Sequence, residues 1–185
     1  MSIATPVIAD RIFPRSLATN ISLIFGGAAL TAIAAQIQIP MWPVPMTMQT
    51  LAVLLVGAAL GAKRGALSLS LYLALGAAGL PVFASAKSLT GVIPTAGYIV
   101  GFVAAAAVVG YLASRGFSST PIKMALSFAL GSVVIYGFGI SGLMLALGLD
   151  MSTAIAVGVI PFLIGDVVKA AAAAALLPLA WKLVR

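Results

Sequence analysis

The chain contains no cysteine, no histidine and no glutamate, and its only acids are Asp10, Asp150 and Asp166. Without cysteine there is neither a disulfide nor a thiolate that could act as nucleophile or metal ligand. Without histidine and glutamate the chain lacks the side chains that most often perform general acid–base catalysis and metal-assisted hydrolysis. These absences disfavour an enzyme, although an intramembrane enzyme that uses other residues stays open as an alternative.

Charge is also scarce, because charged side chains make up 7% of the 185 residues and hydrophobic ones make up 63%. A soluble domain carries about 25% charged residues, so this chain has too few to cover a surface that faces water. Lipid is therefore expected to be the solvent over most of its surface. At about 20 apolar residues per spanning helix, we expect a single membrane-embedded domain over residues 1–185.

Apolar stretches divide the chain and predict an all-α, polytopic membrane protein with six transmembrane helices. They cover residues 17–37, 48–62, 66–80, 96–114, 124–149 and 161–184, and a short interfacial helix is expected at 152–159. The second and third stretches are short, and a re-entrant hairpin is the alternative to two spans. Such a hairpin would place Lys63 and Arg64 deep in the bilayer at about 2.5–3.5 kcal/mol each, so two short spans are favoured.

The basic residues predict the orientation of these spans. With a cytoplasmic N-terminus, the inner segments hold Arg11, Arg15, Lys63, Arg64, Arg115, Lys123, Lys182 and Arg185, and the outer segments hold only Lys87. The positive-inside rule therefore predicts that both termini are cytoplasmic. It also explains the net charge of +7 without nucleic acid, because the basic residues lie on separate loops. The first apolar run is long for a signal peptide and is expected to be retained as a span.

The outer connections are longer and less basic than the inner ones. Residues 38–46 contain three prolines, which forbid a regular helix, and residues 81–95 contain Phe83 and almost no charge. Long ordered loops on one face favour a lid over a binding site. The alternative is ordinary packing at the membrane interface, with Trp42 as a headgroup anchor.

The sharpest feature is the pair of ionisable residues Asp166 and Lys169 within the last apolar stretch. Their i,i+3 spacing places them on one helix face, and each would be costly in contact with lipid, so both are expected to face the bundle interior. The favoured interpretation is a polar clamp for a solute, in which Asp166 accepts N–H donors and Lys169 donates to a carboxylate or carbonyl oxygen. The alternatives are an ion pair satisfied within itself, which only orients the helix, and a proton relay.

Two other segments supply candidate contacts near the same outer surface. At the start of the 96–114 stretch, Thr95 can cap the helix, Gly97 allows close approach of the backbone to a ligand, and Tyr98 offers a ring and a hydroxyl. The alternative there is a simple cap with an interfacial tyrosine. Gln49, at the start of the 48–62 stretch, carries an uncharged amide that can bind a solute, and an ordinary helix start is its alternative.

Partners are suggested by two further observations. Ala28 and Ala32 lie four residues apart in the first stretch, a spacing that permits close helix contact, and they are expected to face a partner helix outside this chain. No Gly-x-x-x-x-Gly-Lys-[Ser/Thr] motif occurs in the chain. If ATP drives uptake, another subunit must therefore bind the nucleotide, and no cofactor is expected here.

Five motifs follow one another along the chain. They are PMTMQT at 45–50, GAALG at 57–61 with a basic turn after it, GAAGLPVF at 76–83, PTAGYIVGF at 94–102 and PFLIGDVVK at 161–169. Together they resemble the BioY family, the biotin-specific substrate-capture (S) components of energy-coupling factor transporters. The resemblance implies six helices, termini in the cytoplasm, and biotin bound near the outer face under the first and third loops.

The resemblance also implies roles for particular residues and partners. Asp166 and Lys169 match the family's functional acid and amine, and we expect the biotin ring system to lie against Trp42, Phe83 and Tyr98. A membrane-embedded coupling subunit and two cytoplasmic ATPases are the implied partners, with the first helix as the docking face. Capture of another vitamin such as thiamin, and action as a stand-alone oligomeric facilitator, remain alternative functions.

Overall fold

The computed structural model describes residues 7–90 and 93–184. Its helices are α1 (Ile8–Ile12), α2 (Leu17–Gln36), α3 (Gln49–Ala77), α4 (Ala96–Leu112), α5 (Pro121–Leu147), α6 (Met151–Gly158) and α7 (Leu163–Val184). Shorter helical turns are η1 (Ala84–Ala86), η2 (Ala113–Phe117) and η3 (Ile160–Phe162). The strands β1 (Gln38–Ile39) and β2 (Met46–Thr47) pair antiparallel in the proline-rich connection. The expected helix boundaries and the short helix before α7 are found within a few residues.

Within the described residues, five helical regions are long and apolar enough to cross a membrane, and one of them, α3, is folded in two. Gly61 has a φ of 83°, which an L-residue with a side chain rarely adopts. The two limbs run back alongside each other, because a Cβ on Gly65 would lie 3.0 Å from Cα of Gly57 and Gln49 hydrogen-bonds to Tyr72. The described chain thus places six apolar segments in the bundle, and the predicted all-α fold with six helices is confirmed.

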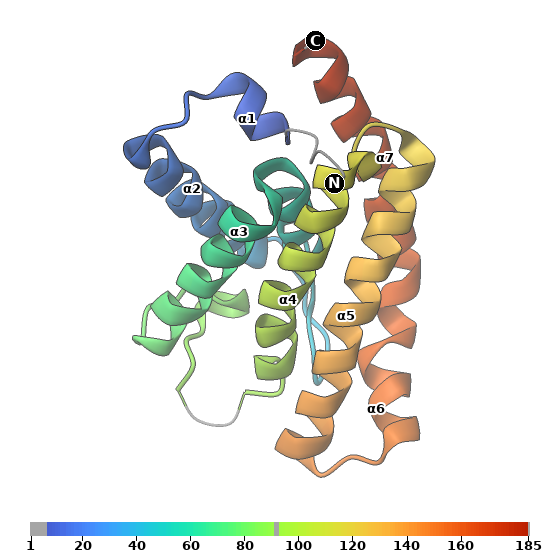
Figure 1. Cartoon of the computed structure of the whole chain (residues 1–185). Coiled ribbons are helices and arrows are strands. Elements are labelled where there is room, and N and C mark those ends of the chain that lie inside the picture. The colour runs from blue at the N-terminus through green and yellow to red at the C-terminus, as the bar shows by residue number, and fades with distance from the viewer. Residues whose placement is uncertain (1–6, 91–92, 185) are drawn as a thin grey trace.

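Helix α4 occupies the middle of the bundle between α3 and α5 (Figure 1). Its backbone approaches α3 so closely that a Cβ on Gly110 would lie 2.3 Å from the nitrogen of Ala62. Similarly, a Cβ on Gly57 would lie 2.7 Å from the carbonyl oxygen of Ala106. Small residues let apolar helices pack by backbone contact, which compensates for the absence of a hydrophobic driving force between helices in lipid.

Helix α2 covers α3 with its small-residue face, and this corrects one expectation. Ala28 is 2% exposed, and a Cβ on the preceding Gly27 would lie 2.6 Å from Oγ of Ser68 on α3. Ala28 is therefore not available to a partner, because the face that was expected to dock outward is used within the chain. Ala32 is partly buried against the same core. The outward face of α2 carries larger apolar side chains, namely Ile21, Phe25, Leu30 and Ile33.

The two ends of the bundle differ in charge. Helix α1, the Gly61 turn, the α4–α5 connection and the C-terminal end of α7 lie at one end, and the α5–α6 connection lies at the other (Figure 1). The segments at the first end carry the basic residues Arg11, Arg15, Lys63, Arg64, Arg115, Lys123 and Lys182, whereas Lys87 lies on the connection from η1 to α4. Arg185 lies outside the described residues. Arg64 is fixed there by Asp10, at 2.6 Å, and by Asn20, at 3.4 Å.

Asp150 starts α6 at the end of the bundle opposite α1. Its carboxylate accepts hydrogen bonds from the backbone amides of Ser152 and Thr153 and from their hydroxyls. These bonds, that of the Ser152 hydroxyl first, hold the pKa of the Asp150 carboxyl well below its usual value. The ionised carboxylate satisfies amides that the first helical turn leaves free, which explains why α6 begins here.

We expect the Gly110→Ala substitution to lower the free energy of unfolding by about 2 kcal/mol, because its methyl group would overlap the backbone of Gly61 and Ala62. Gly137→Ala is the matched control, since a Cβ on this α5 residue meets nothing within 4 Å. The control should be neutral or stabilising by up to about 1 kcal/mol, through helix propensity. Denaturation of both purified variants in detergent measures the difference, and equal stabilities would contradict the proposed role of the backbone contact.

Candidate solute-binding site

A cavity lies at the end of the bundle opposite α1, between β2 and helices α3, α4, α5 and α7. Its interior leaves about 40 Å³ for the centres of water-sized molecules, and all gaps between the lining atoms, the open mouth included, total about 530 Å³. Its walls are mainly apolar and aromatic, and they consist of Val44, Pro45, Thr47, Gln49, Thr50, Phe83, Ala84, Thr95, Tyr98, Ile99, Phe102, Ile135, Tyr136, Phe162 and Lys169. Among these lining residues of the described chain, Lys169 alone carries a charge.

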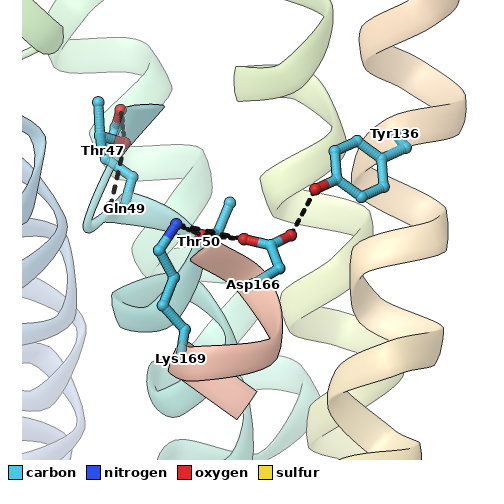
Figure 2. Close-up of polar contacts among 6 residues, drawn as sticks. All are labelled: Thr47, Gln49, Thr50, Tyr136, Asp166 and Lys169. Carbon is cyan, nitrogen blue, oxygen red and sulfur yellow. Dashed lines mark hydrogen bonds and ion pairs between the residues drawn. The ribbon is translucent and has the colours of Figure 1, made fainter. Parts of the chain in front are cut away.

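Lys169 and Asp166 form an ion pair within a larger polar network. The Nζ of Lys169 lies 3.2 Å from Oδ1 of Asp166 and donates to Oγ1 of Thr50 at 2.8 Å. On the other side of the carboxylate, the Tyr136 hydroxyl donates to Oδ2 of Asp166 at 2.5 Å (Figure 2). The side chains of Lys169 and Asp166 are 11% and 13% exposed. The pair is not satisfied within itself alone, because Thr50 of α3 and Tyr136 of α5 complete it.

The rotation of α7 explains why the two ionisable groups face inward. Between them in sequence, Val167 and Val168 are 70% and 65% exposed and cover the outer face of the helix. Three residues along a helix return to nearly the same face, so valines on one side place Asp166 and Lys169 together on the other. Asp166 also lies in the first turn of α7, where the free amides and the helix dipole favour a negative charge.

An open groove of about 610 Å³ runs along the outside of the bundle between α3, α5 and α7. Asp166 lines this groove and not the cavity, whereas Thr50, Tyr136 and Lys169 line both. The polar network is therefore the wall between the cavity and the groove. In this position Asp166 orients Lys169 and Tyr136, and its direct contact with a solute stays a prediction.

Gln49 and Phe83 line the cavity and are linked through Tyr72, and their contact with a solute stays a prediction. The Gln49 amide donates to the Tyr72 hydroxyl at 2.7 Å and accepts from the Thr47 hydroxyl at 3.0 Å. Tyr72 donates in turn to the carbonyl oxygen of Val82 at 3.2 Å. The ring of Phe83 is 2% exposed and packs edge-on to the Tyr72 ring, with centroids 5.2 Å apart. Helix α3 thus holds the loop that covers the cavity.

The three candidates at the start of α4 fall in different places. Thr95 and Tyr98 line the cavity, and the Tyr98 hydroxyl donates to the carbonyl of Gly158 at 2.8 Å. Thr95 occupies the N-cap position, but its side chain makes no capping hydrogen bond, which corrects the expectation of a cap. Gly97 faces α5, where a Cβ would lie 2.4 Å from the carbonyl oxygen of Phe138. Its missing side chain therefore serves helix packing rather than the approach of a ligand.

Trp42 is, after Asp166 and Gly97, a third predicted contact that does not line the cavity. Its side chain is 80% exposed on the β1–β2 connection, which agrees with the alternative of an interfacial anchor. Conversely, the sequence analysis missed Thr50 and Tyr136. The only available signal was a tyrosine hydroxyl within an apolar helix, which requires a hydrogen-bond partner inside the bundle.

Comparison with known proteins gives one consistent result. A family model described as the BioY family matches residues 7–185. The protein named "Biotin transporter BioY" from Rhizobium etli is 41% identical over 143 residues, which cover 72% of this chain and 76% of the relative. The protein of the same name from Thermotoga maritima is 40% identical over 148 residues, which cover 79% and 86%.

A solved structure shares the fold. It is described as the crystal structure of the S-component for biotin from an ECF-type ABC transporter, and it matches with a TM-score of 0.79 over 89% of this chain and 92% of that chain. At 21% sequence identity, this likeness concerns the fold. The multi-pass architecture, the family match over nearly the whole chain and the identities to the two relatives lead to one conclusion: the chain belongs to the BioY family.

Proposed function

We propose that this chain captures biotin for uptake across the cell membrane, as the substrate-specific subunit of an energy-coupling factor transporter. The observation that supports this most strongly is Lys169, a cation that is 9% exposed on the wall of an otherwise apolar and aromatic cavity. Biotin has a carboxylate at one end and a compact bicycle at the other, which joins a thioether ring to a cyclic urea with N–H donors and a carbonyl acceptor. The relatives from Rhizobium etli and Thermotoga maritima are named biotin transporters.

In this proposal the ammonium of Lys169 binds the carboxylate of biotin. An ammonium has three donors, and Thr50 and Asp166 engage two of them, which leaves one for the ligand. Asp166 pairs with Lys169 and Tyr136 keeps Asp166 in place, so the cation is available without being an unpaired charge in the membrane. The rings of Phe83 and Tyr98 lie on the cavity wall, where they can pack against the ring system.

The Lys169→Met variant is expected to bind biotin at least a hundredfold more weakly, because it keeps the length of the side chain and removes the ammonium. Biotin methyl ester, which has no carboxylate, should bind wild-type protein weakly and should lose little further affinity in the variant. Isothermal titration of purified protein with both ligands measures the four dissociation constants.

Titration with other vitamins serves as the control for this experiment. Tighter binding of thiamin than of biotin to the wild type would refute the proposed substrate. An unchanged affinity of the Lys169→Met variant for biotin would remove this lysine from the binding site.

The Tyr136→Phe substitution removes only the hydroxyl that donates to Asp166. We expect about a tenfold loss of biotin affinity, since a hydrogen bond to a charged group contributes about 1.5–3 kcal/mol and part of it is retained through Thr50. Tyr111→Phe makes the same chemical change at a tyrosine that is 51% exposed and does not line the cavity. The control should bind biotin like the wild type, and equal losses in both variants would argue against a role of Tyr136 at the site.

The basic end of the bundle is, in this proposal, the cytoplasmic end, with both termini inside the cell. Because the chain has no cysteine, single cysteines report its orientation directly. Lys87→Cys should react with a membrane-impermeant maleimide in intact cells, whereas Lys63→Cys should react only after permeabilisation. Both positions are exposed, so accessibility to the reagent differs only through the membrane. The reverse pattern would place the cavity in the cytoplasm and contradict uptake.

A membrane-embedded coupling subunit and two cytoplasmic ATPases complete the proposed transporter. The chain lacks a phosphate-binding loop motif, which supports nucleotide binding by another subunit. With Ala28 buried, the docking face is assigned to the outward side of α2, around Phe25, Ala29 and Ile33. Uptake of biotin by cells that lack every coupling subunit would instead identify a stand-alone facilitator.

A further inference from the structure

The segment that covers the cavity, residues 82–87, has an unfavourable backbone conformation. Ser85 has φ 61° and Ala86 has φ 53°, so two successive residues with a side chain lie in the left-handed region. Side chains other than glycine enter this region with a steric penalty, and such strain persists only where surrounding contacts over-determine it. A backbone hydrogen bond from Phe83 to Lys87, at 2.9 Å, closes the turn from within. Tyr72 of α3 also holds this lid segment, through the Val82 carbonyl and the Phe83 ring, and further contacts come from α2 and β1.

Gln36, the last residue of α2, brackets the lid segment with its side-chain amide. The Nε2 atom donates to the carbonyl oxygen of Phe83 at 3.0 Å and, less favourably, to that of Ala32 at 3.3 Å. The Oε1 atom accepts from the backbone amide of Ala86 at 3.2 Å. One side chain thus binds the backbone at both ends of the turn. Gln38 also reaches the lid segment, but it bonds only to the side chain of Ser85.

The contact between Gln36 and the lid segment acts together with the Tyr72 ring on the position of Phe83. This ring is 2% exposed, lines the cavity and fills the space beside Gly76, where a Cβ would lie 2.0 Å from the ring. The carbonyl that Gln36 binds belongs to the same residue. We infer that Gln36 is a positioning residue, which seats Phe83 over the cavity and sets how often the lid segment opens for a solute to enter or leave.

Rate constants of biotin binding test this inference, and this arm rests on the proposed function. In Gln36→Leu, the association and dissociation rate constants should both rise about tenfold, because opening precedes entry as well as exit and two hydrogen bonds are lost. The dissociation constant should stay within about twofold, since Gln36 does not line the cavity. Gln38→Leu is the matched control, because it removes bonds to the Ser85 side chain and none to the lid backbone, and its rate constants should change much less than those of Gln36→Leu. Stopped-flow measurement of biotin binding to purified protein provides these values.

Hydrogen exchange provides a second arm that needs no ligand. The amide of Ala86, which donates to Gln36, and its neighbours in the lid segment should exchange about tenfold faster in Gln36→Leu, while peptides of α5 stay unchanged. If wild-type protein fails to bind biotin, the proposed substrate is wrong, and the exchange data still decide the role of Gln36. Unchanged exchange in the lid segment would overturn the inference. A weaker affinity with an unchanged association rate constant would overturn it too, because Gln36 would then act on the bound solute.

Discussion

Keeping one ammonium and one carboxylate out of lipid is the constraint that fixes α7 against the rest of the bundle. Burying either group alone within an apolar span would cost free energy. As a pair, the two groups still need further hydrogen-bond partners for the N–H donors and carboxylate oxygens that they do not use on each other. Thr50 on α3 and Tyr136 on α5 supply these, so the orientation of three helices follows from one polar network. The same side chains separate the cavity from the lateral groove, so the network that orients the helices also forms part of the cavity wall.

Much of the fold follows from hydropathy, since each apolar stretch must form a helix to satisfy its backbone in lipid. The β1–β2 pair did not follow from this reasoning, because the three prolines of its connection exclude helix without specifying what replaces it. The pairing of the α3 limbs depends on the positive φ of Gly61, and a glycine-rich sequence does not single out this residue. Small-residue spacing on α2 indicated close packing correctly, but it cannot distinguish a neighbour within the chain from one outside it.

Residues of the candidate site could be predicted from the sequence where their exposure to lipid would cost free energy. Asp166 and Lys169 stood out because an apolar span tolerates ionisable groups only with inward partners. Tyr136 could not be singled out by such a cost, because tyrosine is common in membrane helices. Its hydroxyl points to the site only once the structure shows the Asp166 carboxylate beside it. Trp42 was expected at the cavity from loop composition and family resemblance. Neither of these predicts the direction in which the side chain points, and it points to the surface.

The folded-back α3 has a consequence for the surrounding bilayer. Its limbs, 49–60 and 62–77, are about 18 and 24 Å long at 1.5 Å per residue, whereas the hydrocarbon core is about 30 Å thick. Contact with α2 and α4 keeps part of the α3 limbs away from lipid. Where the limbs do face lipid, the bilayer must thin to match their length. Hydrophobic mismatch therefore links the stability of this hairpin to acyl-chain length, and membranes of short-chain lipids are its most favourable surroundings.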